Sequence, residues 1–338
     1  MPKTAIMLGP DTEAVRKKLA EFNAMAKNLG GAVEFKLVDT RLPFDEIAKL
    51  CQGAIALHPA VYRQLTRDQV TELVKRTPTV KLVQTPSAGT DMYDKPTLAK
   101  MSVPVANHGG ANAVAVAEHA IALMVAVYRK LDRQIACVKA GTWSDPIVAM
   151  PEGEFHTLVG KRVGIVGLGR IGSRVAKRLY GWECEVVYHD IKDFSREYVE
   201  AAHAERVGFE SLLKTCDIVS LHVPLDPPTH HMVSERELQM MKRTAVLINT
   251  CRGPVVDEAA LIRALGDKVI FGAGLDVTEV EPIEMGNPLL GMDNVILTPH
   301  QATRAIESVM NAKKFVVENI SRLARGEPVE SIVDPVEL

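Results

Sequence analysis

Three residues with chemically useful side chains each follow an apolar stretch. Arg252 follows AVLINTC, Glu281 follows GLDVTEV and His300 follows NVILTP. A guanidinium binds a carboxylate through two parallel hydrogen bonds, an imidazole exchanges a proton near neutral pH, and a neighbouring carboxylate favours the protonated imidazole. Singly, each residue also fits an ordinary role: a solvated loop arginine, a turn before proline, or a helix cap. Together they form a set that could bind a small acid and move a proton at its reacting atom.

The apolar stretches before these residues belong to a longer series that we interpret as strands. Continuously apolar strands that alternate with helices are typical of parallel sheets covered on both faces, so the fold class is α/β. Ligands of such sheets bind beyond the carboxyl ends of the strands, where the three residues fall. The series is TAIMLG, AVEFKLVD, AIALHP, VKLVQTP, VGIVGLG, EVVYHD, DIVSLHVP, AVLINTCRG, IFGAGLDV and NVILTPH.

Length, charge and cysteine content limit the classes of protein to which the chain could belong. A chain of 338 residues predicts about two domains, and a net charge of -2 argues against nucleic-acid or anionic-membrane partners. The opening MPKTAIMLGPDT is predicted to be a strand, not a signal peptide or membrane span. Five scattered cysteines without a C-x-x-C pair fit a reducing cytoplasm and argue against a zinc site. The adjacent pair His230 and His231 is interpreted as a solvated loop, so no metal is expected.

A glycine pattern indicates the cofactor. Gly167, Gly169 and Gly172 follow the strand-like VGIV and open a helical segment that leads to EVVYHD. In this context the first glycine permits a sharp turn, the second leaves room for a pyrophosphate, and the third lets the helix approach the sheet. Asp190 ends the second strand, where a carboxylate accepts hydrogen bonds from ribose hydroxyls and repels a 2′-phosphate. NAD is therefore favoured over NADP, although the cation Lys192 leaves NADP open.

The chain resembles the D-isomer-specific 2-hydroxyacid dehydrogenases, a family that includes phosphoglycerate dehydrogenase and the glyoxylate and hydroxypyruvate reductases. The resemblance covers nearly the whole chain, and its motifs agree in order and spacing. They are SAGTDMYD (87 to 94), ANAVAVAEHAIALMVA (111 to 126), VGIVGLGRIGSRVAKRL, NTCRGPVVDEAAL, GLDVTEVEP and LTPHQA. The resemblance implies an enzyme that interconverts a D-2-hydroxy acid and a 2-keto acid, with glyoxylate, hydroxypyruvate and a phosphorylated hydroxy acid as candidates.

The resemblance also implies a role for each site residue. Arg252 would hold the substrate carboxylate and carbonyl oxygen, His300 would protonate that oxygen, and Glu281 would hydrogen-bond the imidazole. Backbone N–H groups around Ser87, Ala88 and Gly89 would complete the carboxylate cradle, and Asp276 would face the nicotinamide carboxamide. The full cofactor set implied is Gly167, Gly169, Arg170, Ile171, Gly172, Asp190, His222, Pro224, Thr229, Thr250, Cys251, Asp276 and His300.

The resemblance further implies two doubly wound parallel-sheet domains, with a Rossmann NAD-binding domain inserted into a flavodoxin-like substrate domain. Residues 1–106 and 301–338 would form the substrate domain and 107–300 the NAD domain, with a hinge that closes a cleft between them. A long apolar helix from about 113 to 129, with Asn112 as its N-cap, marks the boundary. This helix is too apolar for a lone surface helix, and the family resemblance predicts a homodimer through it.

Departures from the family pattern leave alternatives open. Cys251 stands where alanine is usual, Thr278 where an aromatic is frequent, and QATRA follows His300. We interpret Cys251 as a small apolar filler without a redox role. His58 ends AIALHP and could contact substrate, but surface exposure is favoured. The alternative functions are a formate dehydrogenase of the same fold, against which Glu281 argues, and a NAD(H)-sensing corepressor or scaffold without turnover.

Overall fold

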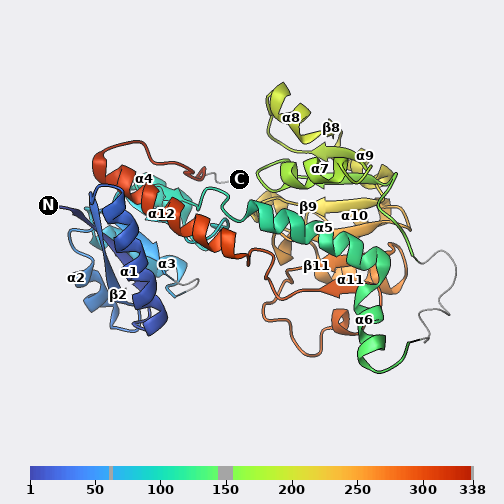
Figure 1. The fold of residues 1–338 in the computed structure, drawn as a ribbon, viewed down its shortest axis with the longest axis horizontal. Helices are drawn as coiled ribbons and strands as arrows, with labels where there is room; N and C mark the ends of the chain where they lie inside the picture. Colours follow the sequence, from blue (N-terminus) through green and yellow to red (C-terminus); the bar gives the residue numbers. More distant parts are fainter. Residues whose placement is uncertain (61–63, 144–154, 336–338) are drawn as a thin grey trace. The chain divides into compact units, whose positions relative to one another are not determined.

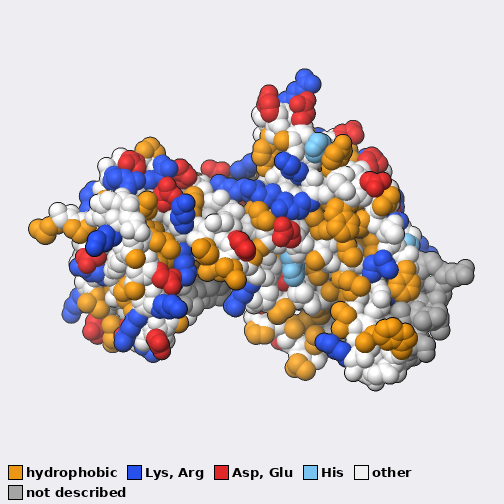
Figure 2. All heavy atoms as spheres, viewed as in Figure 1, with side chains coloured by type: hydrophobic (Ala, Val, Ile, Leu, Met, Phe, Trp, Pro, Cys, Tyr) orange, Lys and Arg blue, Asp and Glu red, His pale blue; other side chains and the backbone are white. Residues whose placement is uncertain are grey.

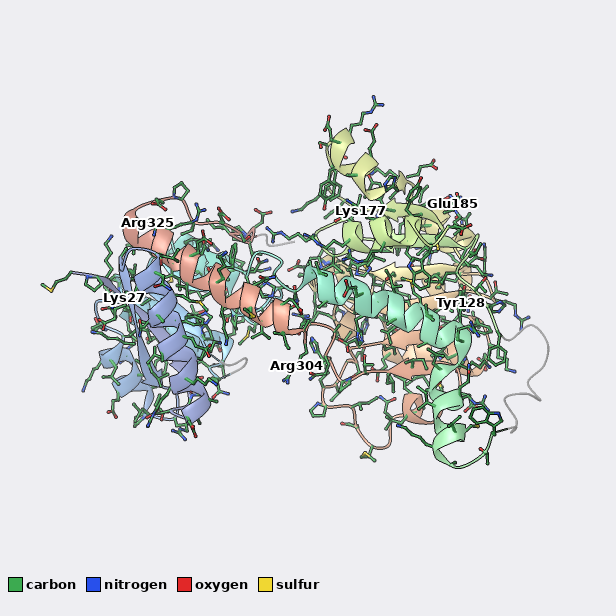
Figure 3. All side chains as sticks on the ribbon, in the orientation of Figure 1. Lys27, Tyr128, Lys177, Glu185, Arg304 and Arg325 are labelled. Atoms are coloured by element: carbon green, nitrogen blue, oxygen red, sulfur yellow. The ribbon has the colours of Figure 1, made fainter. Side chains whose placement is uncertain are left out.

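The chain folds into two units, shown in Figure 1, in a computed structural model that describes residues 1–60, 64–143 and 155–335. The first unit comprises Met1–Asn112 and Ala305–Leu338, and the second comprises Ala113–Arg304. Arg304, labelled in Figure 3, is thus the last residue of the second unit. The second unit is an insertion in the first. Its boundaries lie a few residues beyond the predicted ones at 106 and 300.

The first unit is built on a five-stranded parallel sheet with the order β2-β1-β3-β4-β5, the flavodoxin-like order. Two helices from opposite ends of the chain, α1 and α12, lie together against one face of this sheet (Figure 1). The elements are β1 (Lys3–Gly9), α1 (Glu13–Asn28), β2 (Val33–Asp39), α2 (Phe44–Leu50), β3 (Ala56–Pro59), α3 (Arg67–Arg76), β4 (Leu82–Gln84), α4 (Lys95–Lys100), β5 (Val105–Ala106) and α12 (Ile306–Arg325).

The second unit contains a seven-stranded parallel sheet with the order β12-β11-β10-β9-β6-β7-β8, the Rossmann order with one more strand. The order reverses between β6 and β9, which places the expected ligand crevice at their carboxyl ends. The elements are α5 (Ala113–Arg129), α6 (Leu131–Lys139), β6 (Arg162–Val166), α7 (Gly172–Tyr180), β7 (Glu185–His189), α8 (Arg196–Ala202), β8 (Glu205–Arg206), α9 (Phe209–Thr215), β9 (Ile218–Leu221), η1 (Pro227–Thr229), α10 (Glu235–Met240), β10 (Val246–Asn249), η2 (Gly253–Val255), α11 (Glu258–Gly266), β11 (Gly272–Leu275), η3 (Pro288–Gly291) and β12 (Val295–Leu297).

Strand β10 shows why the central strands are continuously apolar. Val246 and Ile248 face the core formed with α5 and α7, whereas Leu247 faces the core formed with α9, α10 and α11. All three side chains are fully buried. Burial of each side chain of this size contributes roughly 1.5–3 kcal/mol. Because successive residues enter opposite cores, no position is left for a polar residue until the strand ends.

Helix α5 is covered by its own chain. It crosses one face of the sheet beside α7 (Figure 1) and packs on β10 and β11. Met124 and Tyr128 are buried, and the Tyr128 hydroxyl, labelled in Figure 3, donates a hydrogen bond to the Asp217 carbonyl at 3.2 Å. Packing within the unit therefore explains the apolar character from which the homodimer was predicted. The helix starts after Asn112 as expected, but Asn112 Oδ1 accepts no hydrogen bond among the described residues, so the predicted cap is wrong.

Helix α6 exposes apolar side chains between charged ones such as Asp132 and Lys139. Ile135 and Val138 on this helix are exposed, and Trp143, which follows it, is 88% exposed. Figure 2 shows hydrophobic side chains (orange) over this part of the second unit.

None of the helices within the described ranges is both long and apolar enough to cross a membrane. The five cysteines are free thiols.

His58 lies inside the first unit, so the expectation that it is exposed was wrong. It sits on β3, between β1 and β4, and is 1% exposed. Its Nδ1 is 2.8 Å from the Gln84 carbonyl, and its ring stacks on Phe22 at a centroid distance of 5.4 Å. Burial lowers the pKa of His58 to about 3, so the imidazole is neutral at physiological pH. A central strand buried on both faces accounts for this placement.

Candidate active site

The glycines of the predicted cofactor fingerprint shape the turn from β6 to α7. Gly167 has a φ of +93°, and a Cβ there would lie 2.6 Å from the His222 carbonyl oxygen. A Cβ on Gly172 would overlap the Gly167 carbonyl and lie 2.8 Å from Ile165 Cγ2. A Cβ on Gly169, in contrast, would meet nothing within 4 Å. Two glycines are thus required by the chain itself, and the middle one leaves the space that a pyrophosphate needs.

Asp190, one residue beyond β7, is tied to this turn. Its Oδ2 accepts a hydrogen bond from the Leu168 N–H at 2.7 Å, and its Oδ1 accepts one from the Lys192 N–H at 2.8 Å. A carboxylate oxygen has more than one acceptor site, so both oxygens retain capacity for ribose hydroxyls. Tyr198 on α8 holds the other side of the turn, because its hydroxyl lies 3.2 Å from the carbonyl oxygens of both Leu168 and Gly169. No sequence pattern singled out Tyr198.

Two unsatisfied polar atoms lie at the exits of the next strands. His222 Nδ1, after β9, and Thr250 Oγ1, after β10, are buried and have no hydrogen-bond partner within the described part of the chain. His222 Nε2 is 2.9 Å from Ser220 Oγ, and burial lowers the pKa of His222 to about 3, so it is a neutral donor or acceptor. Buried polar groups normally find partners. With the open space above Gly169 and the carboxylate of Asp190, these atoms fit a dinucleotide at the switch point.

The other residues of the predicted cofactor set follow β6, β9 and β10. Arg170 is exposed on the turn, and Ile171 packs against the core under α7. The Thr229 hydroxyl donates a hydrogen bond to the Pro224 carbonyl at 2.7 Å, which closes the loop after β9. These positions agree with contact to a cofactor at the sheet edge. Their roles stay predictions.

Cys251 fits the filler interpretation. Its Sγ is 3.1 Å from Asn249 Oδ1, and burial raises the pKa of the thiol to about 11. The reactive form of cysteine is the thiolate, which such a pKa disfavours at neutral pH. Nothing in this geometry supports a redox role.

Arg252, Glu281 and His300 follow β10, β11 and β12, three strands that are neighbours in the sheet. His300 Nδ1 lies 2.8 Å from Glu281 Oε2. Asn249 Nδ2 donates a hydrogen bond to the Arg252 carbonyl at 2.9 Å, and Arg252 Nη1 donates one to the Cys251 carbonyl at 2.7 Å. The arginine is close enough to Glu281 for its charge to affect that carboxyl group. The structure therefore brings the three predicted residues together.

The charges of this group favour an ionised Glu281. Burial opposes ionisation, but the hydrogen bond and charge of His300, the Thr278 N–H and the Arg252 charge together hold the pKa of Glu281 below its usual value. The side chains of His300 and Glu281 are 37% and 28% exposed. Because an ionised carboxylate only accepts hydrogen bonds, its contact with His300 requires a proton on Nδ1 of the imidazole. When the imidazole takes up a second proton, that proton is on Nε2.

Asp276 holds the loop that carries His300. Its carboxylate, on a side chain that is 1% exposed, accepts hydrogen bonds from the Thr298 hydroxyl at 2.6 Å and from the N–H groups of Gln301 and Ala302, both at 2.9 Å. Its carbonyl accepts the His300 N–H at 2.8 Å. These contacts support a left-handed backbone at His300, where φ is +54°. Such a backbone is uncommon for a residue with a Cβ and persists where its surroundings fix it. The predicted contact of Asp276 with a carboxamide stays a prediction.

Gly253 joins the arginine loop to the glutamate loop. A Cβ on Gly253 would lie 2.5 Å from the Glu279 amide nitrogen and still closer to the Thr278 carbonyl. The backbone after β10 therefore touches the backbone after β11 directly. This contact joins the loops that carry Arg252 and Glu281.

The Ser87–Gly89 loop belongs to the first unit and is held by its own hydrogen bonds. The Ser87 hydroxyl donates to the Gly89 carbonyl at 2.9 Å, and the Thr85 hydroxyl donates to the Ser87 carbonyl at 2.8 Å. Asn107 Nδ2 donates to the Ala88 carbonyl at 3.5 Å. These contacts give the loop a defined shape. Its role as a substrate cradle stays a prediction.

The histidine pair after β9 is only partly the solvated loop that was expected. His230 is exposed, but His231 Nε2 lies 2.6 Å from Glu279 Oε1. Across residues 1–60, 64–143 and 155–335, no group of three histidine, cysteine or acidic side chains could hold a metal ion.

Comparison with known proteins places these motifs in one family. The sequence model described as "D-isomer specific 2-hydroxyacid dehydrogenase, NAD binding domain" matches residues 121–302. The glyoxylate reductase of Thermofilum pendens is 38% identical over 267 residues, which cover 78% of this chain and 77% of that protein. The glycerate dehydrogenase of Methylorubrum extorquens is 32% identical and covers 97% of this chain and 98% of its own.

A solved structure extends the likeness to the whole fold. The holo form of D-mandelate dehydrogenase from Rhodotorula graminis superimposes with a TM-score of 0.83 at 27% identity. The match covers 99% of this chain and 98% of that one.

Proposed function

Because the chain belongs to the D-isomer specific 2-hydroxyacid dehydrogenase family, we propose that it interconverts a D-2-hydroxy acid and its 2-keto acid with NAD as cofactor. The observation that carries the proposal is the convergence of Arg252, Glu281 and His300 at the ends of three adjacent strands. The glycine turn and Asp190 lie in the same unit, at the ends of β6 and β7.

In the proposed reaction Arg252 binds the substrate carboxylate, and His300 moves the proton. A bound nicotinamide supplies the hydride for reduction and accepts it in oxidation. During reduction His300 would donate its Nε2 proton to the carbonyl oxygen, so that the keto acid becomes the hydroxy acid without a free alkoxide. Glu281 remains a carboxylate, keeps the other proton on Nδ1 and stabilises the imidazolium. In oxidation the neutral imidazole takes the hydroxyl proton.

Asp190 supports NAD over NADP. Its carboxylate would accept hydrogen bonds from the adenosine ribose and repel a 2′-phosphate. Lys192 and Arg206 flank it, and Arg206 Nη2 donates a hydrogen bond to the Asp190 carbonyl at 2.9 Å. The ratio of kcat/KM with NADH and NADPH tests this part of the proposal.

The proposed substrates are glyoxylate, hydroxypyruvate and a phosphorylated 2-keto acid. The names of two relatives, a glyoxylate reductase and a glycerate dehydrogenase, support the first two. The test is a panel of about twenty keto acids, with formate in the reverse direction, assayed by NADH absorbance. NADH binding without turnover on the panel would reject the enzyme and favour a sensing scaffold. His300→Ala should lower kcat strongly and leave NADH affinity near normal.

We also propose a homodimer in a reducing cytoplasm. The sequence predicts this dimer through the 113–129 helix region, and the exposed Ile135, Val138 and Trp143, on and just after the neighbouring helix α6, are further apolar side chains that a second copy would cover. The five free thiols support the compartment. Light scattering at micromolar concentration should give twice the chain mass, and a monomer mass would reject this assembly.

A further inference from the structure

A second histidine and carboxylate pair lies outside the proposed acid and base group. His231, between η1 and α10, places its Nε2 at 2.6 Å from Glu279 Oε1. The two side chains are 38% and 31% exposed, so the contact is partly shielded from water. Glu279 stands two residues before Glu281 on the loop after β11.

Glu279 is also fixed from its other side. Its N–H donates a hydrogen bond to Glu258 Oε2 at 2.9 Å, and its Oε1 accepts one from the Glu258 N–H at 3.3 Å. Glu258 Oε1 in turn accepts a hydrogen bond from Asn287 Nδ2 at 2.7 Å. The start of α11 therefore holds the Glu279 backbone, and His231 and the Glu258 N–H both contact the Glu279 carboxylate, His231 at the shorter distance.

His231 touches two of the loops that carry proposed catalytic groups. Its N–H donates a hydrogen bond to the Pro254 carbonyl at 2.8 Å, two residues after Arg252. Its ring reaches Glu279 on the loop of Glu281. The backbone of His231 is left-handed, with a φ of +51°, which turns the residue so that both contacts form. A single residue thus bridges the arginine loop and the glutamate loop.

We propose that His231 is a positioning residue for the reaction: through Glu279 it holds Glu281 at hydrogen-bond distance from His300. This inference rests on the proposed function. Groups that orient a catalytic side chain without touching substrate commonly change activity by about 10- to 100-fold when removed. The alternative is that the pair only stabilises the fold, like many partly exposed ion pairs.

Several titratable groups of the second unit face His231 and His300. His231 faces Glu279, stacks on His230 at a centroid distance of 4.0 Å, and contributes its charge to Asp257. The Ala260 N–H is the main cause of the lowered pKa of Asp257, and the His231 charge adds to it. His300 faces Glu281, on which Arg252 also acts.

The kinetic test compares His231→Ala with the matched control His230→Ala, which removes the exposed neighbouring ring. We expect a fall in kcat of about 10-fold or more for His231→Ala, with NADH affinity within about twofold of the wild type. His230→Ala should remain within about twofold of the wild type. His231→Gln, which retains an N–H donor of similar reach, should recover most of the activity. Glu279→Ala should lower kcat by the same factor as His231→Ala. The variant with both substitutions should have a kcat no lower than either single variant.

The pH profile separates positioning from simple stabilisation. If Glu281 moves away in His231→Ala, the protonated imidazole of His300 loses part of its support. The alkaline limb of the kcat profile for reduction should then move to lower pH in this variant and stay in place in His230→Ala. The proposal would be overturned if folded His231→Ala kept the pH profile and the kcat of the wild type. It would also be overturned if His231→Ala and His230→Ala lost the same amount of activity.

A measurement without turnover separates this inference from the proposed function. In protein labelled at the histidine rings, NMR follows the titration of His300 directly. A shift of that titration in His231→Ala and Glu279→Ala, but not in His230→Ala, supports the coupling even if no substrate is turned over. An unshifted titration in both folded variants overturns it, whatever the activity. If His231→Ala does not fold, Glu279→Ala replaces it, and His231→Gln serves as the variant in which the His300 titration should stay where it is in the wild type.

Discussion

Substituting Gly253 by alanine should separate Arg252 from Glu281 without removing either side chain. A Cβ on Gly253 would lie 2.5 Å from the Glu279 amide nitrogen and closer to the Thr278 carbonyl. Atoms in ordinary contact are about 3.5 Å apart, so one loop must retreat by roughly 1 Å or more. Both neighbours are backbone atoms that cannot rotate away as a flexible side chain would. The displacement must therefore pass to the loops that carry the proposed catalytic groups.

A misplacement of about 1 Å between reacting groups costs on the order of 100-fold in rate, or about 2.7 kcal/mol of transition-state stabilisation. We therefore expect Gly253→Ala to lower kcat/KM for the keto acid by about 100-fold. Overpacking should also cost about 1–3 kcal/mol of stability. NADH oxidation followed by absorbance, well below the thermal midpoint, measures the first effect. Thermal unfolding measures the second.

Gly266→Ala is the matched control. Gly266 ends α11 in the same unit, and a Cβ there would meet nothing within 4 Å. This variant should retain activity within about twofold and gain a few tenths of a kcal/mol or more in stability. Gly253→Ala with activity within about threefold of wild type would show that the loop contact does not set the geometry of the site.

Three further predictions concern single site residues. Arg252→Ala should lower kcat/KM by at least about 100-fold, mainly through weaker binding of the keto acid, and retained activity would reject its role. The native fold lowers the pKa of Glu281 below its value in the unfolded chain. The ionised carboxylate therefore stabilises the native state at any pH above the pKa that Glu281 has in the unfolded chain. This stabilisation is lost as the pH falls through the pKa that Glu281 has in the native state. The thermal midpoint of Glu281→Gln should therefore lie below that of wild type at pH 7, with the difference shrinking below about pH 4; a constant difference would contradict this. Asp190→Ser should raise the KM for NADH by about 10-fold and improve the use of NADPH relative to NADH, and an unchanged preference would remove Asp190 as the discriminating residue.

Most of the scaffold could be predicted from the sequence because each central strand is buried on both faces. Runs such as AVLINTC have no polar position until the strand ends, so the first polar residue marks the carboxyl edge of the sheet. That rule places Arg252 and His300 at the same edge from sequence alone. The two-residue strands β5 and β8 were missed, because so short a strand has no periodicity to read.

Contacts between distant loops could not be predicted. Tyr198 holds the glycine turn from about 30 residues away, and nothing in its neighbours signals that contact. The link from His231 to Glu279 joins segments 48 residues apart, and the adjacent histidines gave only the interpretation of a solvated loop. The sequence predicts wrongly that His58 is exposed, because a polar residue at the end of an apolar run is typical of the exit of a strand, whereas His58 is 1% exposed. Its strand is central, so its end is buried too.

The insertion of one unit into the other has a consequence for biosynthesis on the ribosome. The first unit needs α12 and the tail, because Val316, Val317 and Ile320 belong to its core and Ala106 bridges to Ile332. These residues emerge only after Ala113–Arg304 have been made. At roughly 5–20 residues per second, one face of the nascent N-terminal sheet then stays only partly covered, by α1 without α12, for about 10–40 seconds. The inserted unit is continuous in sequence and can fold first, so we expect the N-terminal segment to be the part of the chain that depends on chaperones during translation.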